Sequence, residues 1–168
     1  MSDNTNLNKE KDLKKKIVYI DMDNTVVDFV SGINKLTEKE REQYQGEEDN
    51  HPLIFSLMDP MPGAIDAITK LNDEYELYLL STAPWDNPNA WKQKRDWVGK
   101  FFGEKEGTIF WKKLILSHHK NLNKGDYLID DRPCHNGAND FTGELIHFGS
   151  EEYPDWKSVS TYLINVGK

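Results

Sequence analysis

Apolar residues along this chain gather in short runs that are separated by longer, more polar segments. The runs at 16–21 (KIVYID), 76–81 (ELYLLS) and 126–130 (DYLID) are rich in aliphatic and aromatic residues, which predicts three buried β-strands. Shorter runs at 114–117 and 145–148 predict two further strands. Continuous apolar runs of this kind are typical of parallel strands that are covered on both faces.

Between these runs, apolar residues recur every three or four positions, as they do along one face of an amphipathic helix. This spacing predicts helices at 64–75 and 155–166. Asn87 and Pro88 predict the start of another helix, with Asn87 as the capping residue and Pro88 in the first turn. Strands that alternate with helices indicate an α/β fold with a parallel central sheet. The residues expected to share one face of the helix after Pro88 are Trp91, Arg95 and Val98.

The composition fits one globular domain, because 37% of the 168 residues are hydrophobic and 30% are charged. No apolar run approaches the roughly 20 residues that a membrane-spanning helix needs. The first 16 residues are polar and charged, and they lack the apolar stretch of a secretory signal. We therefore expect a cytoplasmic protein with a loose N-terminal tail at 1–16 and no membrane partner.

The formal net charge of −8 narrows the range of partners. So acidic a chain would repel a nucleic-acid polymer, whereas a small anion could still bind where local cations meet it. The single cysteine, Cys134, excludes an internal disulfide and a multi-cysteine metal site. We expect a small-molecule ligand, and the sequence leaves the oligomeric state, including a homodimer, undecided.

Polar residues with catalytic potential follow the ends of the predicted strands. In a parallel sheet the carboxyl ends of the strands share one edge, where ligands bind, so these residues should meet in one crevice. Any one of them could be an ordinary turn or surface residue, but their recurrence at successive strand ends favours a site. The residues are Asp21, Asp23, Ser81, Thr82, Lys120, Asp130 and Asp131.

These residue types point to phosphoryl chemistry. Crowded carboxylates raise one another's pKa, and a hard divalent cation such as Mg²⁺ relieves their repulsion. Asp21 could attack phosphorus and form an aspartyl phosphate, while Asp23 could protonate the leaving oxygen and then activate water. We expect Ser81, Thr82 and Lys120 to bind the phosphate oxygens.

The order of these groups, beginning with DMDNT, resembles the four motifs of the haloacid dehalogenase (HAD) superfamily. The resemblance implies a three-layer, Rossmann-like core in which Asp21 is the nucleophile and Asp23 the general acid and base. It also implies that Mg²⁺ binds to Asp21, to the backbone carbonyl of Asp23 and to Asp131, with Asp130 beside them. Many members carry glycine where this chain has Asn24, which can also adopt a left-handed turn.

Within that superfamily, STAPWDNPNAWKQKRDWVGKFFG, IDDRP and NGANDFTGELIHFG resemble the 5'(3')-deoxyribonucleotidase branch. This resemblance implies a nucleoside monophosphate as substrate and a small helical cap at 28–59. The cap would interrupt a core made of 17–27 and 60–168. It also implies that Phe29 packs against the substrate base. Further candidates for an apolar lining are Ile54, Phe55 and Trp85.

Other functions remain open beside a deoxyribonucleotidase. The same motifs could serve a phosphatase for another small metabolite, such as a sugar phosphate. Asp23 argues against dehalogenase chemistry, because a departing halide needs no proton. A non-enzymatic, phospho-accepting signalling domain would carry its acid pair before the acceptor, whereas here the pair Asp130 and Asp131 comes last.

Overall fold

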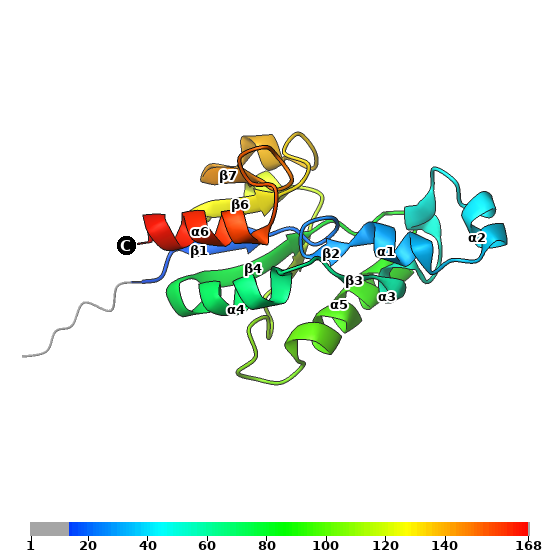
Figure 1. Cartoon of the computed structure of the whole chain (residues 1–168), viewed down its shortest axis with the longest axis horizontal. Helices are drawn as coiled ribbons and strands as arrows, with labels where there is room; N and C mark the ends of the chain where they lie inside the picture. Colours follow the sequence, from blue (N-terminus) through cyan, green and yellow to red (C-terminus); the bar gives the residue numbers. More distant parts are fainter. Residues whose placement is uncertain (1–13, 168) are drawn as a thin grey trace, which may run out of the picture.

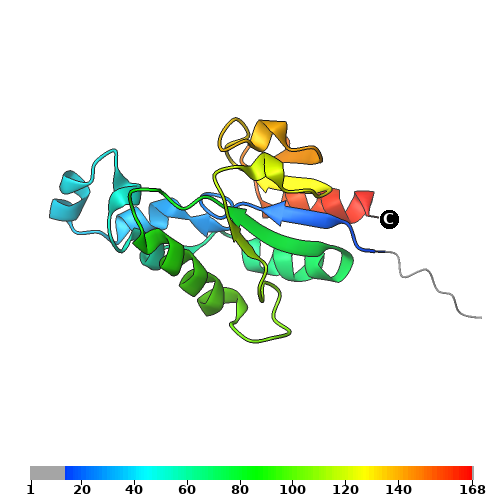
Figure 2. The same cartoon turned by 180° about the vertical axis from the view of Figure 1, so that it is seen from behind.

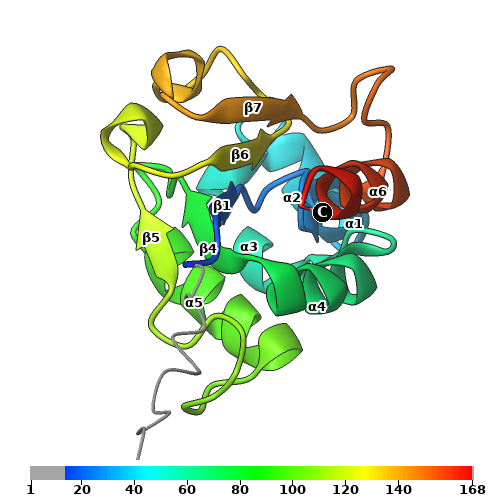
Figure 3. The same cartoon turned by 90° about the vertical axis from the view of Figure 1, so that its left-hand side faces the viewer.

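A five-stranded parallel sheet forms the centre of the fold (Figure 1), and Figure 3 shows all five strands in the order β5-β4-β1-β6-β7. The computed structural model describes residues 14–167, so most of the tail expected at 1–16 lies outside the described residues. The strands are β1 (Ile17–Ile20), β4 (Glu76–Ser81), β5 (Leu114–Leu116), β6 (Tyr127–Asp130) and β7 (Glu144–His147). The α/β fold class and the five expected strands are confirmed.

Successive residues of each strand face opposite sides of the sheet, so both faces need apolar residues. In β1, Val18 and Ile20 belong to the larger core, whereas Tyr19 packs on the other face with Leu128 and Phe141. The helices that cover the larger core are α4 (Ala64–Glu74), α5 (Asn89–Phe102) and α6 (Trp156–Val166). Figure 3 shows α4 and α6 side by side along the sheet. None of the helices in the described part of the chain combines the length and apolar character that a membrane crossing requires.

The start of α5 differs from the expectation. The Asn87 side chain does not cap this helix: its amide donates to the backbone carbonyls of Asp49 and His51, at 2.8 and 3.1 Å. The helix begins at Asn89, and Pro88 occupies the position before it. A side-chain amide can satisfy distant carbonyls as well as a helix end, and capping preference alone does not distinguish the two.

The buried face of α5 is also rotated from the expected one. Trp91 and Arg95 are exposed, and only Val98 of the expected set is buried. The residues of α5 that are buried are Ala90, Lys94, Trp97 and Val98. The shift arises because a lysine occupies a core position, which a pattern of apolar residues cannot reveal.

Residues 29–58 form a helical insertion between two short antiparallel strands, β2 (Val27–Asp28) and β3 (Asp59–Pro60). Its elements are α1 (Phe29–Asn34), α2 (Glu38–Gln43), the 3-10 helix η1 (Glu48–Asn50) and α3 (Ile54–Leu57). Figures 1 and 2 show the insertion beyond the carboxyl ends of the strands, with α2 farthest from the sheet. It coincides with the segment expected as a cap, and its action as a cap stays a prediction.

The first turn of α6 anchors the loop that follows β1. Trp156 is 1% exposed, and its indole Nε1 donates to the Thr25 carbonyl at 2.7 Å. Asp155 caps α6, because its carboxylate accepts a hydrogen bond from the Ser158 backbone N–H at 2.8 Å. The same helix end therefore fixes the backbone a few residues beyond Asp21.

The substitution Trp156→Phe should destabilise the fold by at least about 1–3 kcal/mol, because the buried Thr25 carbonyl loses its donor and the smaller phenyl ring leaves part of the indole's volume unfilled. Urea unfolding followed by circular dichroism measures this change. The control Trp91→Phe, at a side chain that is 40% exposed, should change stability by less than about 0.5 kcal/mol. Wild-type stability in Trp156→Phe would show that this bond does not hold the loop.

Candidate active site

Three carboxylates meet at the carboxyl ends of two neighbouring strands. Asp21 directly follows β1, Asp130 ends β6, and Asp131 comes next in the chain. One carboxylate oxygen of each lies within 4.8 Å of the others. Asp21 and Asp130 are buried, and Asp131 is half-buried. We call these three residues the acidic cluster.

Lys120, in the 3-10 helix η2 (Lys120–Leu122), compensates two of these charges. Its Nζ donates to Asp21 Oδ1 at 2.8 Å and to Asp130 Oδ2 at 2.5 Å, and the residue is 3% exposed. Burial by itself lowers the pKa of Lys120, but Asp21 and Asp130 together raise that pKa above its ordinary value. Lys120 is thus the counter-ion of the acidic cluster, and its expected contact with phosphate remains a prediction.

Within the described residues, Asp131 is the member of the acidic cluster with a buried carboxylate oxygen that accepts no hydrogen bond. Both oxygens of Asp130 are engaged, since its Oδ1 accepts a hydrogen bond from the Arg132 backbone N–H at 2.8 Å. Within residues 14–167, the buried Oδ1 of Asp131 has no hydrogen-bond partner. Burial, reinforced by Asp21 and Asp130, raises the pKa of Asp131 to about 7. An acceptor in these surroundings fits a hard cation that prefers oxygen ligands.

A second buried lysine, Lys94 of α5, lies in the site without having been expected there. Its Nζ donates to Asp23 Oδ2 at 2.6 Å and to Ser81 Oγ at 3.0 Å, and it lies 4.7 Å from the Phe55 ring centroid. Burial is the main cause that raises the pKa of Asp23 above its ordinary value, and Asp21 adds to it, although Lys94 acts to lower that pKa. Apolar periodicity gave no signal for Lys94, because it assigned the buried face of this helix to Trp91, Arg95 and Val98.

The two hydroxyls after the apolar part of β4 have different surroundings. Ser81 is fully buried, and its Oγ accepts the hydrogen bond from Lys94. Thr82 lines a cavity, and its Oγ1 donates to the Ser117 carbonyl at 3.0 Å. Neighbouring residues of an extended chain face opposite sides. The geometry therefore favours Thr82 as the hydroxyl that meets a substrate and disfavours direct contact between Ser81 and phosphate.

A cavity of about 410 Å³ opens beside the acidic cluster, and we call it the substrate cavity. The helical insertion contributes Phe29 and Phe55, whose rings meet edge to face with centroids 5.9 Å apart. Asn24 also lines it and has φ of 58°, the left-handed conformation expected after the nucleophile. The other polar lining residues are Asp23, Glu48, Asp49, Thr82, His118 and Arg132.

The expected apolar lining is only partly brought together. Phe29 and Phe55 line the substrate cavity, but Ile54 is fully buried in the core. Trp85 is 79% exposed, and its ring centroid lies 6.3 Å from that of His118. His118, which was not among the expected site residues, is half-buried and lines the cavity.

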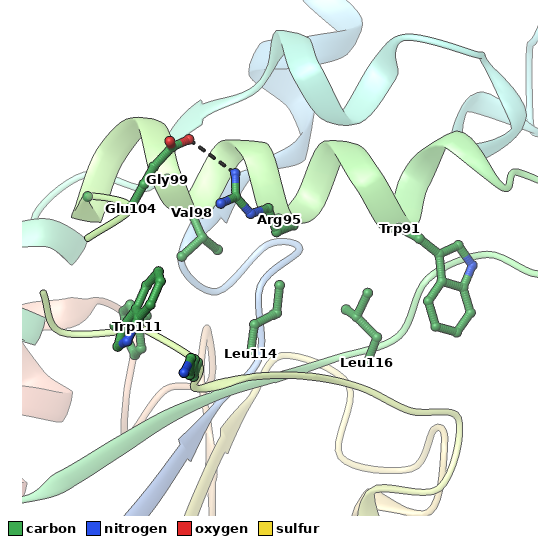
Figure 4. Close-up of a pocket in the computed structure, with 11 residues that line it drawn as sticks. Trp91, Arg95, Val98, Gly99, Glu104, Trp111, Leu114 and Leu116 are labelled. Carbon is green, nitrogen blue, oxygen red and sulfur yellow. Dashed lines mark hydrogen bonds and ion pairs between the residues drawn. The ribbon is translucent and has the colours of Figure 1, made fainter. Parts of the chain in front are cut away.

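Another cavity, of about 520 Å³, lies between α5 and β5. Figure 4 shows Trp91 and Arg95 of the helix on one side and Leu114 and Leu116 of the strand on the other. Arg95 Nη1 pairs with Glu104 Oε1 at 3.1 Å at its edge. Its lining contains no residue of the segments that directly follow β1 and β6. The substrate cavity is lined by Asp23, Asn24 and Arg132, which are chain neighbours of the acidic cluster, so the smaller cavity is the candidate site.

Comparisons with known proteins identify a family and several relatives of this chain. The family model described as 5' nucleotidase, deoxy (pyrimidine), cytosolic type C protein matches residues 38–155. A protein of Vibrio phage KVP40 named as a 5'(3')-deoxyribonucleotidase is 55% identical over 160 residues, which cover 95% of this chain and 91% of the relative. A Staphylococcus aureus protein of the same name is 31% identical over 123 residues, which cover 68% of this chain and 64% of the relative.

A solved structure supports the fold. The HAD-hydrolase YfnB of Bacillus subtilis, bound to magnesium, is similar with a TM-score of 0.52 and 14% identity, over 84% of this chain and 92% of that one. At this identity the likeness concerns the fold alone. Together with the relatives, it confirms the resemblance inferred from the motifs. The chain has a fold like that of a HAD-hydrolase, is a nucleotidase hydrolase, and belongs to the deoxy (pyrimidine) 5' nucleotidase family of cytosolic type C.

Proposed function

We propose that this enzyme removes phosphate from deoxynucleoside monophosphates through an aspartyl phosphate on Asp21. The observation that carries the proposal is the buried Asp21 carboxylate, held by Lys120 and grouped with the partnerless Asp131 oxygen, beside a cavity with aromatic walls. The names of the relatives support a nucleotide substrate. Phe29 and Phe55 are suited to pack against a base, because aromatic side chains offer a large apolar face.

The residues at the strand ends fit a magnesium ion. Asp21, Asp131 and the backbone carbonyl of Asp23 would hold it, and the partnerless Oδ1 of Asp131 is the structural reason for including that residue. When bound, Mg²⁺ would offset the charge of the acidic cluster and polarise a phosphate oxygen. The magnesium in the distant HAD-hydrolase structure supports this choice of metal.

In the proposed reaction, a carboxylate oxygen of Asp21 attacks phosphorus, and the bond from phosphorus to the ester oxygen breaks. Asp23 gives its proton to that oxygen, which leaves as the deoxynucleoside hydroxyl. Water then attacks the aspartyl phosphate while Asp23 takes up its proton, which releases inorganic phosphate and restores Asp21. The pKa of Asp23, raised mainly by burial, supports its first role as an acid.

Lys94 and Thr82 are the proposed donors to the phosphate oxygens, and Thr82 would turn its hydroxyl hydrogen from the Ser117 carbonyl to the phosphate. Lys94 already donates a hydrogen bond to Asp23. Its ammonium would therefore lie close to both the general acid and the transferred phosphoryl group. The buried Oγ of Ser81 accepts a hydrogen bond from Lys94, and we assign this hydroxyl the role of positioning the lysine. We further propose that residues 28–59 act as the cap, since the insertion supplies Phe29 and Phe55 to the substrate cavity.

With Mg²⁺, the enzyme should release phosphate from deoxynucleoside monophosphates faster than from glucose 6-phosphate, and EDTA should abolish the activity. Asp21→Asn should reduce kcat by at least about 1,000-fold, because the nucleophile is lost. The control Asp73→Asn, at an exposed position of α4, should keep wild-type activity. Preferred turnover of the sugar phosphate would remove the nucleotidase proposal, and an active Asp21→Asn would remove the covalent step.

Lys94→Gln should lower kcat/KM by about 100-fold or more, because a buried positive charge near the transferred phosphoryl group is lost. Without Lys94 the pKa of Asp23 should rise further, so the basic limb of the pH profile should move to higher pH. Steady-state kinetics across pH measures both effects. The matched control is Lys92→Gln, at an exposed lysine paired with Asp96. A change of less than about threefold in folded Lys94→Gln would contradict the role of this lysine.

In EDTA, Asp131→Asn should stabilise the protein at pH 8 by roughly 1–2 kcal/mol, allowing for solvent screening. The folded-state pKa of Asp131 is raised to about 7, so its ionisation costs stability as pH rises from about 4 through 7. The gain should therefore be absent near pH 4 and grow toward pH 8 in thermal melting curves. Asp73→Asn serves as the exposed control. A loss of stability in Asp131→Asn at every pH would show that ionisation of Asp131 does not destabilise the folded state.

A further inference from the structure

The cavity between α5 and β5 lies apart from the substrate cavity, and the proposed reaction does not use it. Its volume is about 520 Å³, and its lining shares no residue with that of the substrate cavity. Small-molecule sites in proteins commonly enclose about 300–1,000 Å³ between mainly apolar walls that carry a few polar groups. We call it the α5–β5 cavity, and we infer that it is a second binding site, for a planar aromatic molecule that carries one carboxylate.

Aromatic and aliphatic side chains form the walls of the α5–β5 cavity. Figure 4 shows Trp91 and Val98 pointing from α5 toward the strand, and Leu114 and Leu116 pointing from β5 toward the helix. Trp111 lies at the opposite end of the cavity from Trp91. Trp91 is 40% exposed, and Trp111 and both leucines are half-buried, so the chain covers this apolar surface only in part. Flat indole faces and aliphatic side chains offer surfaces on which a planar ring can stack.

The charged residues in the lining of the α5–β5 cavity sum to a positive charge. They are two cations, Arg95 and Lys112, and one carboxylate, Glu104. This is a local feature, because the chain as a whole has a formal net charge of −8. A monoanion would balance such a lining, whereas a phosphate dianion would exceed its charge. Charge complementarity therefore favours a carboxylate as the anionic group of the ligand.

Arg95 retains hydrogen-bond donors for this carboxylate. Its Nη1 donates to Glu104 Oε1 at 3.1 Å and lies 3.7 Å from Asp96 Oδ1, while Nε and Nη2 bond to no group of the described chain. A guanidinium presents five N–H donors in a plane that matches the geometry of a carboxylate. Gly99 allows the contact with Glu104, because a Cβ at position 99 would lie 2.5 Å from Glu104 Oε1. The guanidinium is thus held at the edge of the cavity with donors to spare.

Lys112 supplies the second cation from a strained backbone. Its φ is 56°, in the left-handed region that is unfavourable for residues with a Cβ and is often found at ligand sites. Its Nζ lies 5.3 Å from the centroid of the Trp111 ring. The neighbouring Lys113 pairs with Glu76 at 2.8 Å, whereas Lys112 makes no ion pair with any described residue. An indole face beside an unpaired ammonium can receive the ring and the carboxylate of one molecule.

Indole-3-propionate and tryptamine test the inference, because both carry an indole ring on a two-carbon chain and differ in the charge at its end. Each would be titrated into isotope-labelled protein, with the indole N–H signals of its tryptophans as reporters. Indole-3-propionate should shift the signals of Trp91 and Trp111 with a Kd of at most about 1 mM, which is reasonable for a ligand of this size. Tryptamine should bind at least about tenfold more weakly, because its ammonium meets cations. The signal of the buried Trp156, which donates to the Thr25 carbonyl, should stay in place.

Two variants separate the role of charge from that of the aromatic wall. The double variant Arg95→Gln and Lys112→Gln should bind indole-3-propionate at least about tenfold more weakly, and it should keep the wild-type melting temperature because both positions are exposed. The matched control Lys70→Gln, at an exposed lysine of α4, should keep the wild-type affinity. Trp91→Ala retains both cations and should weaken the binding of both probes, whereas Trp85→Ala, outside this cavity, should not.

The titrations contain no phosphate ester, so their result is independent of the proposed function. The inference would be overturned if the Trp91 and Trp111 signals stayed in place at about 10 mM indole-3-propionate, a concentration tenfold above the expected Kd. Equal affinity for the two probes, or wild-type affinity of the folded double variant for indole-3-propionate, would likewise overturn it.

Discussion

The buried ammonium of Lys120 allows two aspartates to sit within one small volume at the edge of the sheet. Asp21 and Asp130 are almost without solvent, and buried carboxylates are costly unless a cation and hydrogen bonds compensate them. Lys120 donates to both at 2.8 and 2.5 Å. This arrangement depends on the sheet order, because β1 and β6 are neighbours and their carboxyl ends therefore present Asp21 and Asp130 side by side. The fold brings the charges together, and Lys120 makes their proximity tolerable.

Helix α5 links the reacting end of the site to the helical insertion. It carries Lys94, which contacts Asp23, and also Trp97, whose indole Nε1 donates to the Met58 carbonyl at 2.9 Å. Asn87, just before the helix, holds the backbone of η1. The helix and the residue Asn87 before it therefore contact both Asp23, the proton donor of the proposed reaction, and the backbone of the helical insertion.

The strand ends were predictable from sequence because parallel sheets bring them to one edge. Short apolar runs that stop at Asp21, Ser81 and Asp130 identify both the strands and the polar residues that meet there. Ser81 and Thr82 were both expected at the phosphate, because sequence does not show which of two adjacent hydroxyls faces a cavity. The structure buries Ser81 and places Thr82 in the cavity lining, and the contact of either with phosphate stays a prediction.

The remaining differences share a physical origin: polar side chains whose partners are distant in sequence. Lys94 lies on a buried helix face, where apolar periodicity gives a charged residue no weight. Asn87 satisfies carbonyls of the insertion, although its place before a helix favoured capping. Glu48 and Asp49 line the cavity from the segment that was expected only as a cap. Such residues require the tertiary arrangement before a role can be assigned to them.

The central claim is that Asp21 carries the phosphoryl group during turnover. Rapid acid quenching with dCMP labelled in its phosphate, followed by borohydride reduction and peptide mass spectrometry, locates an aspartyl phosphate, because reduction converts that side chain to homoserine. The account predicts label on the protein during turnover and homoserine at position 21. Turnover at the full rate with no protein-bound label, or label on a residue other than Asp21, would contradict it.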